Sequence, residues 1–99
     1  MANPIKVKFR EWDCVVEKHR YANGRTAIRL IDEHDETSSI AMATVNLPDE
    51  PMAADEVAIK DYSENEGMLA ALTEAGVVEP SHRVCVSGYV TVPVCRVRV

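Results

Sequence analysis

WDCVVEKHRYANGRTAIRLIDE, residues 12–33, is the stretch that decides the fold. Two runs rich in Val, Ile and aromatic residues flank Asn23-Gly24, the dipeptide most typical of a tight β-hairpin. Asn and Gly both tolerate the positive φ that a type I′ turn requires at its two central positions. The stretch therefore predicts two antiparallel strands, near 11–21 and 26–33.

The segments on either side of this hairpin extend the β pattern. PIKVKFR (4–10) alternates apolar with basic residues, which is the period-2 mark of a strand with one buried face. After the polar break EHDETSS, the run SIAMATVNL indicates another strand around 39–47. Consecutive strands joined by short turns favour an antiparallel meander. A loop with two prolines then leads to a short strand over 56–60.

The C-terminal run RVCVSGYVTVPVCRVRV (83–99) is β throughout and predicts one bent strand or two strands. Val84, Val86, Val90 and Val92 share a parity, which Gly88 interrupts at a place suited to a bulge or a close backbone approach. Proline cannot donate to a ladder, so Pro93 marks an edge, a bulge or a bend.

KDYSENEGMLAALTEAGVV (60–78) predicts the helix. Ser63 and Glu66 match a capping box, in which each side chain bonds a free backbone N–H of the first turn. An apolar stripe follows, and Gly76 sits where a helix would end in a left-handed cap. We expect a helix from about 64 to 75. The capping box leaves Asp61, Tyr62, Asn65 and Gly67 unexplained.

Together these elements predict a single α+β domain over 1–99, with a twisted, mainly antiparallel sheet of about 5–7 strands and one helix (about 64–75) packed on it. No apolar run is long enough to cross a bilayer, and the N-terminus lacks the apolar core of a signal peptide, so we expect a cytoplasmic protein. In a reducing compartment the three cysteines are expected to be free, buried thiols: Cys14, Cys85 and Cys95.

Acidic residues are concentrated in the middle of the chain. Residues 32–66 hold eleven acids and one base, Lys60, although the whole chain carries a formal charge of −5. Such a block could complement a partner protein with a basic surface, or imitate a phosphate backbone. It could equally be a set of solvated loops and helix starts. Both interpretations remain open from the sequence.

Spacing argues against most catalytic and metal-binding classes. Only His82 and Cys85 have the sequence spacing that is usual for a pair of zinc ligands, and no second such pair is present to complete a site. No nucleophile elbow, phosphate-binding Gly-rich loop or HExxH motif is present. Bases in 4–10 and in the hairpin could form a stripe, but the acidic net charge opposes phosphate binding. We therefore expect no enzyme activity, cofactor, metal or direct nucleic-acid binding, and no membrane partner.

Three segments resemble an uncharacterised family of small proteins found in bacteria, phages and mobile elements: YANGRTAIRL (21–30), ATVNLPDE (43–50) and DEVAIKDYSENEGMLAALTEAGVV (55–78). The family implies no reaction or cofactor. The resemblance implies a mobile-element setting, in which small acidic proteins are often inhibitors or accessory binders.

Three hypotheses follow. The first is a non-enzymatic accessory protein that binds a host or element protein, for example as an inhibitor of a host defence or nucleic-acid-processing complex, through Asp61, Tyr62, Glu64, Asn65 and Glu66. The alternative is a small enzyme or ligand-binding domain that uses the same polar residues, 61–66, at the helix start. The third is a module that pairs through an exposed strand, with Pro4 or the Val-rich C-terminus at the edge.

Overall fold

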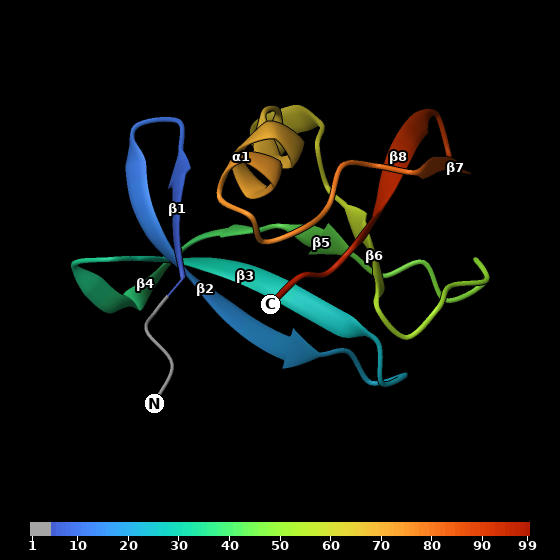
Figure 1. Ribbon diagram of the computed structural model, residues 1–99, viewed down its shortest axis with the longest axis horizontal. Helices are drawn as coiled ribbons and strands as arrows, with labels where there is room; N and C mark the ends of the chain where they lie inside the picture. Colours follow the sequence, from blue (N-terminus) through green and yellow to red (C-terminus); the bar gives the residue numbers. More distant parts are fainter. Residues whose placement is uncertain (1–4) are drawn as a thin grey trace.

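Two four-stranded antiparallel sheets and one α-helix make up the structure, a computed structural model that describes residues 5–99 (Figure 1). The α+β class and the antiparallel pairing are confirmed. The described residues form eight strands, slightly more than the 5–7 expected, and these strands divide between two sheets where the sequence predicted one. The predicted edge at Pro4 lies outside the described residues.

The first sheet is the predicted meander. Its strands are β1 (Lys6–Phe9), β2 (Trp12–Arg20), β3 (Thr26–Asp32) and β4 (Asp35–Met42), and they pair in chain order. Val7 and Phe9 of β1 are buried while Lys6 and Lys8 are exposed, as the alternation predicted. The meander is therefore built from pairings between consecutive strands.

The turn between β2 and β3 differs from the predicted type I′ turn. Gly24 has φ 85°, but Asn23 does not have a positive φ. The Tyr21 N–H donates to the Arg25 carbonyl, and the Gly24 N–H donates to the Tyr21 carbonyl. Three residues therefore lie between Tyr21 and Arg25, and only the last of them, Gly24, has the left-handed conformation.

The second turn of the meander is shorter than the predicted polar break 33–39. Asp32 pairs with Asp35, so only Glu33 and His34 lie between β3 and β4. Register shifts on either side of Ile31 then make the β3–β4 pairing irregular. The polar residues of the break thus belong mostly to an exposed strand.

The second sheet joins distant parts of the chain. It contains β5 (Thr44–Val45), β6 (Glu56–Ile59), β7 (Arg83–Ser87) and β8 (Val90–Arg96), in the order β5-β6-β8-β7. The strand that holds Pro93 is therefore central. Pairing between β8 and β6 extends only from Arg96 to Val94, so the proline lies where that ladder ends.

The C-terminal run forms a hairpin of two strands, with Gly88 and Tyr89 as its turn. Across it, Val86 pairs with Thr91 and Cys85 pairs with Val92. The four valines that share a parity in the sequence do not share a face, because the two-residue turn exchanges the parities. Val84 and Val86 consequently lie on the face opposite Val92.

Helix α1 spans Met68–Glu74, shorter than the predicted 64–75, and a separate 3₁₀ turn covers Ser63–Asn65. Gly67, with φ 99°, interrupts the helical backbone between them. Gly76 ends the helix with φ 77°, as predicted, and the Val77 N–H returns to the Leu72 carbonyl. The helix packs against β1.

The main core lies between the first sheet, α1 and one face of the second sheet, and contains Ile28, Leu30, Ile59, Met68 and Leu72, all fully buried. A smaller cluster on the opposite face of the second sheet contains Ala58, Cys85, Val92 and Val94 under the connection after β5. The three cysteines are free and buried, as predicted. Over residues 5–99, no helix is both long and apolar enough to span a bilayer.

Candidate functional site

The start of α1 is held by Asp61 and not by the predicted capping box. One carboxylate oxygen, Asp61 Oδ1, accepts from the N–H groups of Gly67 and Leu69, each at 3.0 Å. The Ser63 hydroxyl makes no cap, and Ser63 itself has φ 55°. The capping-box prediction is wrong because Gly67 breaks the helical run between Glu66 and Met68. Asp61 and Gly67 are thus explained by the local fold.

Asn65 and Tyr62 also have structural roles. Asn65 is 3% exposed, and its amide donates to the Met42 carbonyl at 2.6 Å, which ties the 3₁₀ turn to the end of β4. Tyr62 is half-buried against the smaller core cluster, and the Lys60 ammonium lies 5.9 Å from its ring centroid. These contacts account for both residues without a partner.

Glu64 and Glu66 are the exposed members of the predicted site. Glu64 pairs with Lys60 at 2.7 Å, and this pair lowers the pKa of Glu64 and raises the pKa of Lys60. The backbone carbonyl of Glu66 accepts from the Arg10 guanidinium at 3.0 Å. The five predicted residues therefore lie together around the helix start, but only two of them present carboxylates to solvent.

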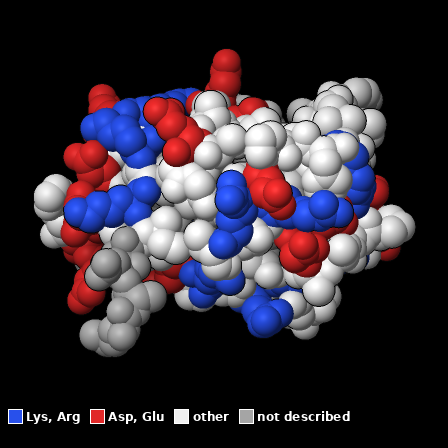
Figure 2. Space-filling view, viewed as in Figure 1, with Lys and Arg blue, Asp and Glu red and all other residues white. Residues whose placement is uncertain are grey.

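The acids of 32–66 are distributed around the molecule. Those of 32–36 lie at the β3–β4 turn, while those of 49–56 lie in the connection between β5 and β6 and at the start of β6, near the other end of the long axis (Figure 1). Figure 2 shows acidic and basic side chains interleaved on the face in view. The eleven acids consequently do not form one face.

The bases of the first sheet bind oxygen atoms of this same chain. Lys6 and Lys8 pair with Glu33 and Asp13, and Arg29 pairs with Glu17. Others donate to backbone carbonyls, as Arg20 does to Gly24. The bases of the predicted stripe are Lys6, Lys8, Arg10, Lys18, Arg20, Arg25 and Arg29, and each has such a contact.

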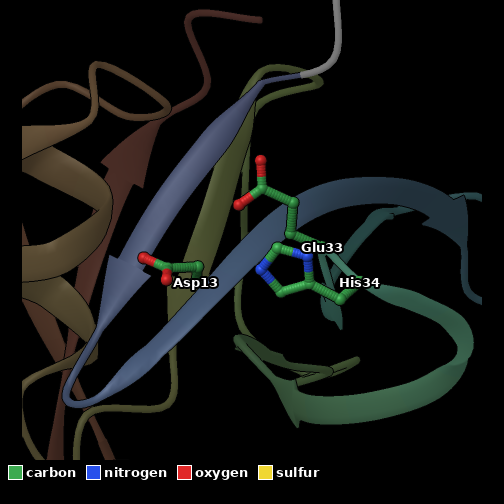
Figure 3. A group of neighbouring side chains, drawn as sticks. All are labelled: Asp13, Glu33 and His34. Atoms are coloured by element: carbon green, nitrogen blue, oxygen red, sulfur yellow. The ribbon is translucent and has the colours of Figure 1, made fainter.

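Three potential metal ligands meet at one end of the first sheet, which the sequence did not indicate. Ligand atoms of Asp13, Glu33 and His34 lie within 4.8 Å of one another (Figure 3). Asp13 comes from β2 and the other two from the β3–β4 turn. The Lys6 ammonium lies 2.6 Å from Glu33, and Lys8 lies 3.2 Å from Asp13. Both carboxylates are thus neutralised by lysines, and the group is a surface ion-pair network.

A second network joins the first residues of β6 and β7, which flank β8 at the same end of the second sheet. Glu56 accepts from the Ala53 N–H at 2.8 Å and from Arg83, and it pairs with His82. These hydrogen bonds, the one from Ala53 first, lower the pKa of Glu56 to about 2. Arg83 also reaches Glu50 at 3.1 Å. The network fixes the β5–β6 connection against the first residue of β7.

The β7–β8 hairpin carries the most exposed apolar side chains. Val84, Val86 and Tyr89 are 59%, 73% and 106% exposed. β7 is also an edge strand. Because a two-residue turn requires a hydrogen-bonded pair at Ser87 and Val90, alternation directs the N–H and C=O groups of Val84 and Val86 away from β8. In the described part of the chain, these groups take part in no backbone hydrogen bond outside the strands.

The other three sheet edges carry features that discourage strand addition. β1 bears Lys6 and Lys8, β4 has an irregular register and acidic residues at its start, and β5 is only two residues long. β7 has none of these after Arg83, whose side chain is engaged by Glu50 and Glu56. β7 is therefore the least protected of the four edges.

A groove of about 260 Å³ borders this edge. Its lining residues are Val86 on one side and the segment Leu47–Glu50 on the other. The Arg25 guanidinium holds that segment by donating to the carbonyls of Leu47 and Glu50, at 2.6 and 2.7 Å. The candidate functional site is the free edge of β7 together with this groove.

Sequence reasoning found the Val-rich tail as a candidate edge but did not distinguish its buried valines from its exposed ones. Comparison of the chain with protein-family models, with curated proteins and with solved structures finds no match.

Proposed function

We propose that the protein is a non-enzymatic accessory protein of a phage or mobile element, and that it acts by binding a host or element protein. The observation that carries the proposal is the free edge of β7, where Val84 and Val86 present both unpaired backbone groups and exposed side chains. Strand addition to such an edge is a common mode of protein recognition, because backbone hydrogen bonds supply affinity and side-chain pockets supply specificity.

The surface proposed for binding is therefore the β7 edge, in preference to residues 61–66. Asp61, Tyr62 and Asn65 are engaged within the chain, whereas no described residue buries Val84, Val86 or Tyr89. An exposed apolar cluster on an unprotected edge is a feature that soluble proteins usually avoid unless it is used. The mobile-element setting is supported by the sequence resemblance. Inhibition of a host defence or nucleic-acid-processing complex is the specific version that we favour.

The small-enzyme alternative receives less support. Two surface grooves of the described residues, one beside Val86 and one lined by Lys6, Lys8, Ala71, Glu74 and Ala75, do not include any of residues 61–66. A catalytic group at the helix start would need a concave site beside it.

A capture experiment with edge variants tests the proposal. Val86→Pro removes the outward N–H without removing a hydrogen bond to β8, because Val86 occupies a non-hydrogen-bonded position of the hairpin. We expect the unmodified protein to retain host proteins from a lysate and Val86→Pro to lose them. Thr91→Lys is the matched control, because Thr91 is exposed, pairs with Val86 and is not at the edge.

Both variants should have the circular dichroism spectrum and melting temperature of the unmodified protein within a few degrees. If folded Val86→Pro retains the same partners as Thr91→Lys, the β7 edge is not the binding surface.

A further inference from the structure

We propose that the segment that pairs with β7 is an extended strand of a partner protein that carries alternating apolar residues and a lysine or arginine seated against Asp49. This inference rests on the proposed function, since it describes the chemistry of the strand that the edge would accept. It concerns the groove beside Val86 and the charge at its far wall.

The groove has a fixed shape before any strand enters. Arg25 donates to two carbonyls of the segment Leu47–Glu50, and the Glu50 N–H donates to the Leu47 carbonyl at 3.0 Å to close a turn. A wall held by three hydrogen bonds loses little conformational entropy on binding. An incoming strand would therefore meet a preformed channel between this wall and Val86.

The exposed valines of β7 favour a partner strand in which apolar residues occupy every second position. Val84 and Val86 are exposed on one face of β7, two residues apart. In an antiparallel pair the residues opposite them project to the same face, so apolar side chains at every second position of the partner would cover them. Leu47 packs against the cluster that contains Cys85 and Val92, so the wall flanks the other face of β7, to which the intervening residues of the partner strand would project.

The negative charge of Asp49 at the wall favours a lysine or arginine on the partner strand. The Glu50 carboxylate already pairs with Arg83 at 3.1 Å. Asp49 is exposed and, within residues 5–99, has no ion pair or side-chain hydrogen bond. A lysine or arginine on the partner strand would complete this position, whereas a glutamate there would meet like charge.

The same charge disfavours a second copy of this chain as the occupant. An antiparallel β7–β7 pair, related by a two-fold axis perpendicular to the sheet, would place both Leu47–Glu50 walls on the same side of the joined sheet. Each wall brings Asp49, and each chain carries a formal charge of −5. A basic strand is therefore the better match for this edge.

Peptide binding to the full-length protein tests the inference. The probes are three capped ten-residue peptides of alternating valine and threonine that differ at one central threonine position, replaced by lysine, glutamine or glutamate. Binding is measured by fluorescence anisotropy at low ionic strength, where exposed charges are least screened. We expect the lysine peptide to bind about tenfold more tightly than the glutamate peptide, with glutamine between them.

Two variants assign the effect to the groove. Asp49→Asn should make the three peptides bind with equal affinity, and Val86→Pro should abolish binding of all three. Amide exchange at Val84 should slow in the presence of the lysine peptide.

The possible failures are separable. Equal affinities for the three peptides, all lost with Val86→Pro, would overturn the basic-strand inference and leave the proposed function standing. A light-scattering mass of two chains that falls to one chain in Val86→Pro would show that a second copy fills the edge, which also overturns the inference. If no peptide binds and lysate capture is unaffected by Val86→Pro, both proposals are wrong.

Discussion

At the scale of single residues, one carboxylate determines how the helical segment begins. Asp61 accepts two backbone N–H groups, from Gly67 and Leu69, which have no partner within the helix. Side-chain caps of this kind contribute about 1 kcal/mol to stability. Asp61 is therefore the residue on which the start of α1 depends.

Removing this cap should destabilise the protein. Asp61→Ala leaves two N–H groups of the helix start without their acceptor, so we expect the free energy of unfolding to fall by about 1–2 kcal/mol in urea titrations. Glu66→Ala is the matched control, because its exposed carboxylate has no ion pair in the described structure. Equal stability of the two variants would show that Asp61 is not the cap.

At the same scale, the carboxylate of Glu56 couples stability to pH. Its pKa is lowered to about 2 in the folded protein from an ordinary value of 4.5, so it stabilises the fold above about pH 4.5. This contribution is lost as the pH falls from about 4.5 to about 2. Glu56→Gln should cost on the order of 1–2 kcal/mol at neutral pH.

The measurement is a set of urea titrations of the unmodified protein and Glu56→Gln between neutral pH and pH 2. We expect the difference in stability to shrink as the pH falls through that range. A difference that stays constant with pH would contradict the assigned ionisation. Glu64→Gln, which alters an exposed pair with Lys60, should leave stability almost unchanged at every pH.

At the scale of elements, the pairing of consecutive strands could be predicted from the sequence, and the division into two sheets could not. Alternation over 6–9 and the turn signal at Asn23-Gly24 depend on near neighbours, so they specify β1, β2 and β3. The order β5-β6-β8-β7 depends on contacts between residues far apart in the chain, which no local pattern contains.

The candidate site was recognised incompletely for the same physical reason. The role of Asn65 is decided by the Met42 carbonyl, 23 residues away, and that of Val86 by the two-residue turn that changes the parity of the tail. Residues 61–66 were predicted as a site because they are polar, although most of their polar groups form hydrogen bonds or ion pairs within the chain. An exposed valine cannot be told from a buried one until its neighbours across the sheet are known.

At the scale of the whole molecule, burial protects the thiols. The pKa of all three cysteines is raised by burial, that of Cys95 to about 11, so the reactive thiolate is scarce at neutral pH. We expect N-ethylmaleimide to label none of them in the native protein at pH 7 within a time that labels all three in concentrated guanidinium chloride. Intact-mass spectrometry counts the labels. Rapid native labelling at any cysteine would show that the core opens readily.

The strand order of the second sheet has a consequence for synthesis on the ribosome. β8 is the central strand, and it pairs both with β6, more than thirty residues earlier, and with β7. Each of the strands β2 to β4 can pair with the preceding strand as soon as it leaves the exit tunnel. In contrast, β6 can pair with β8 only after β8 has been synthesised. The newborn chain therefore carries a paired meander beside a half-built sheet, and the last strand to appear is the one that closes the fold.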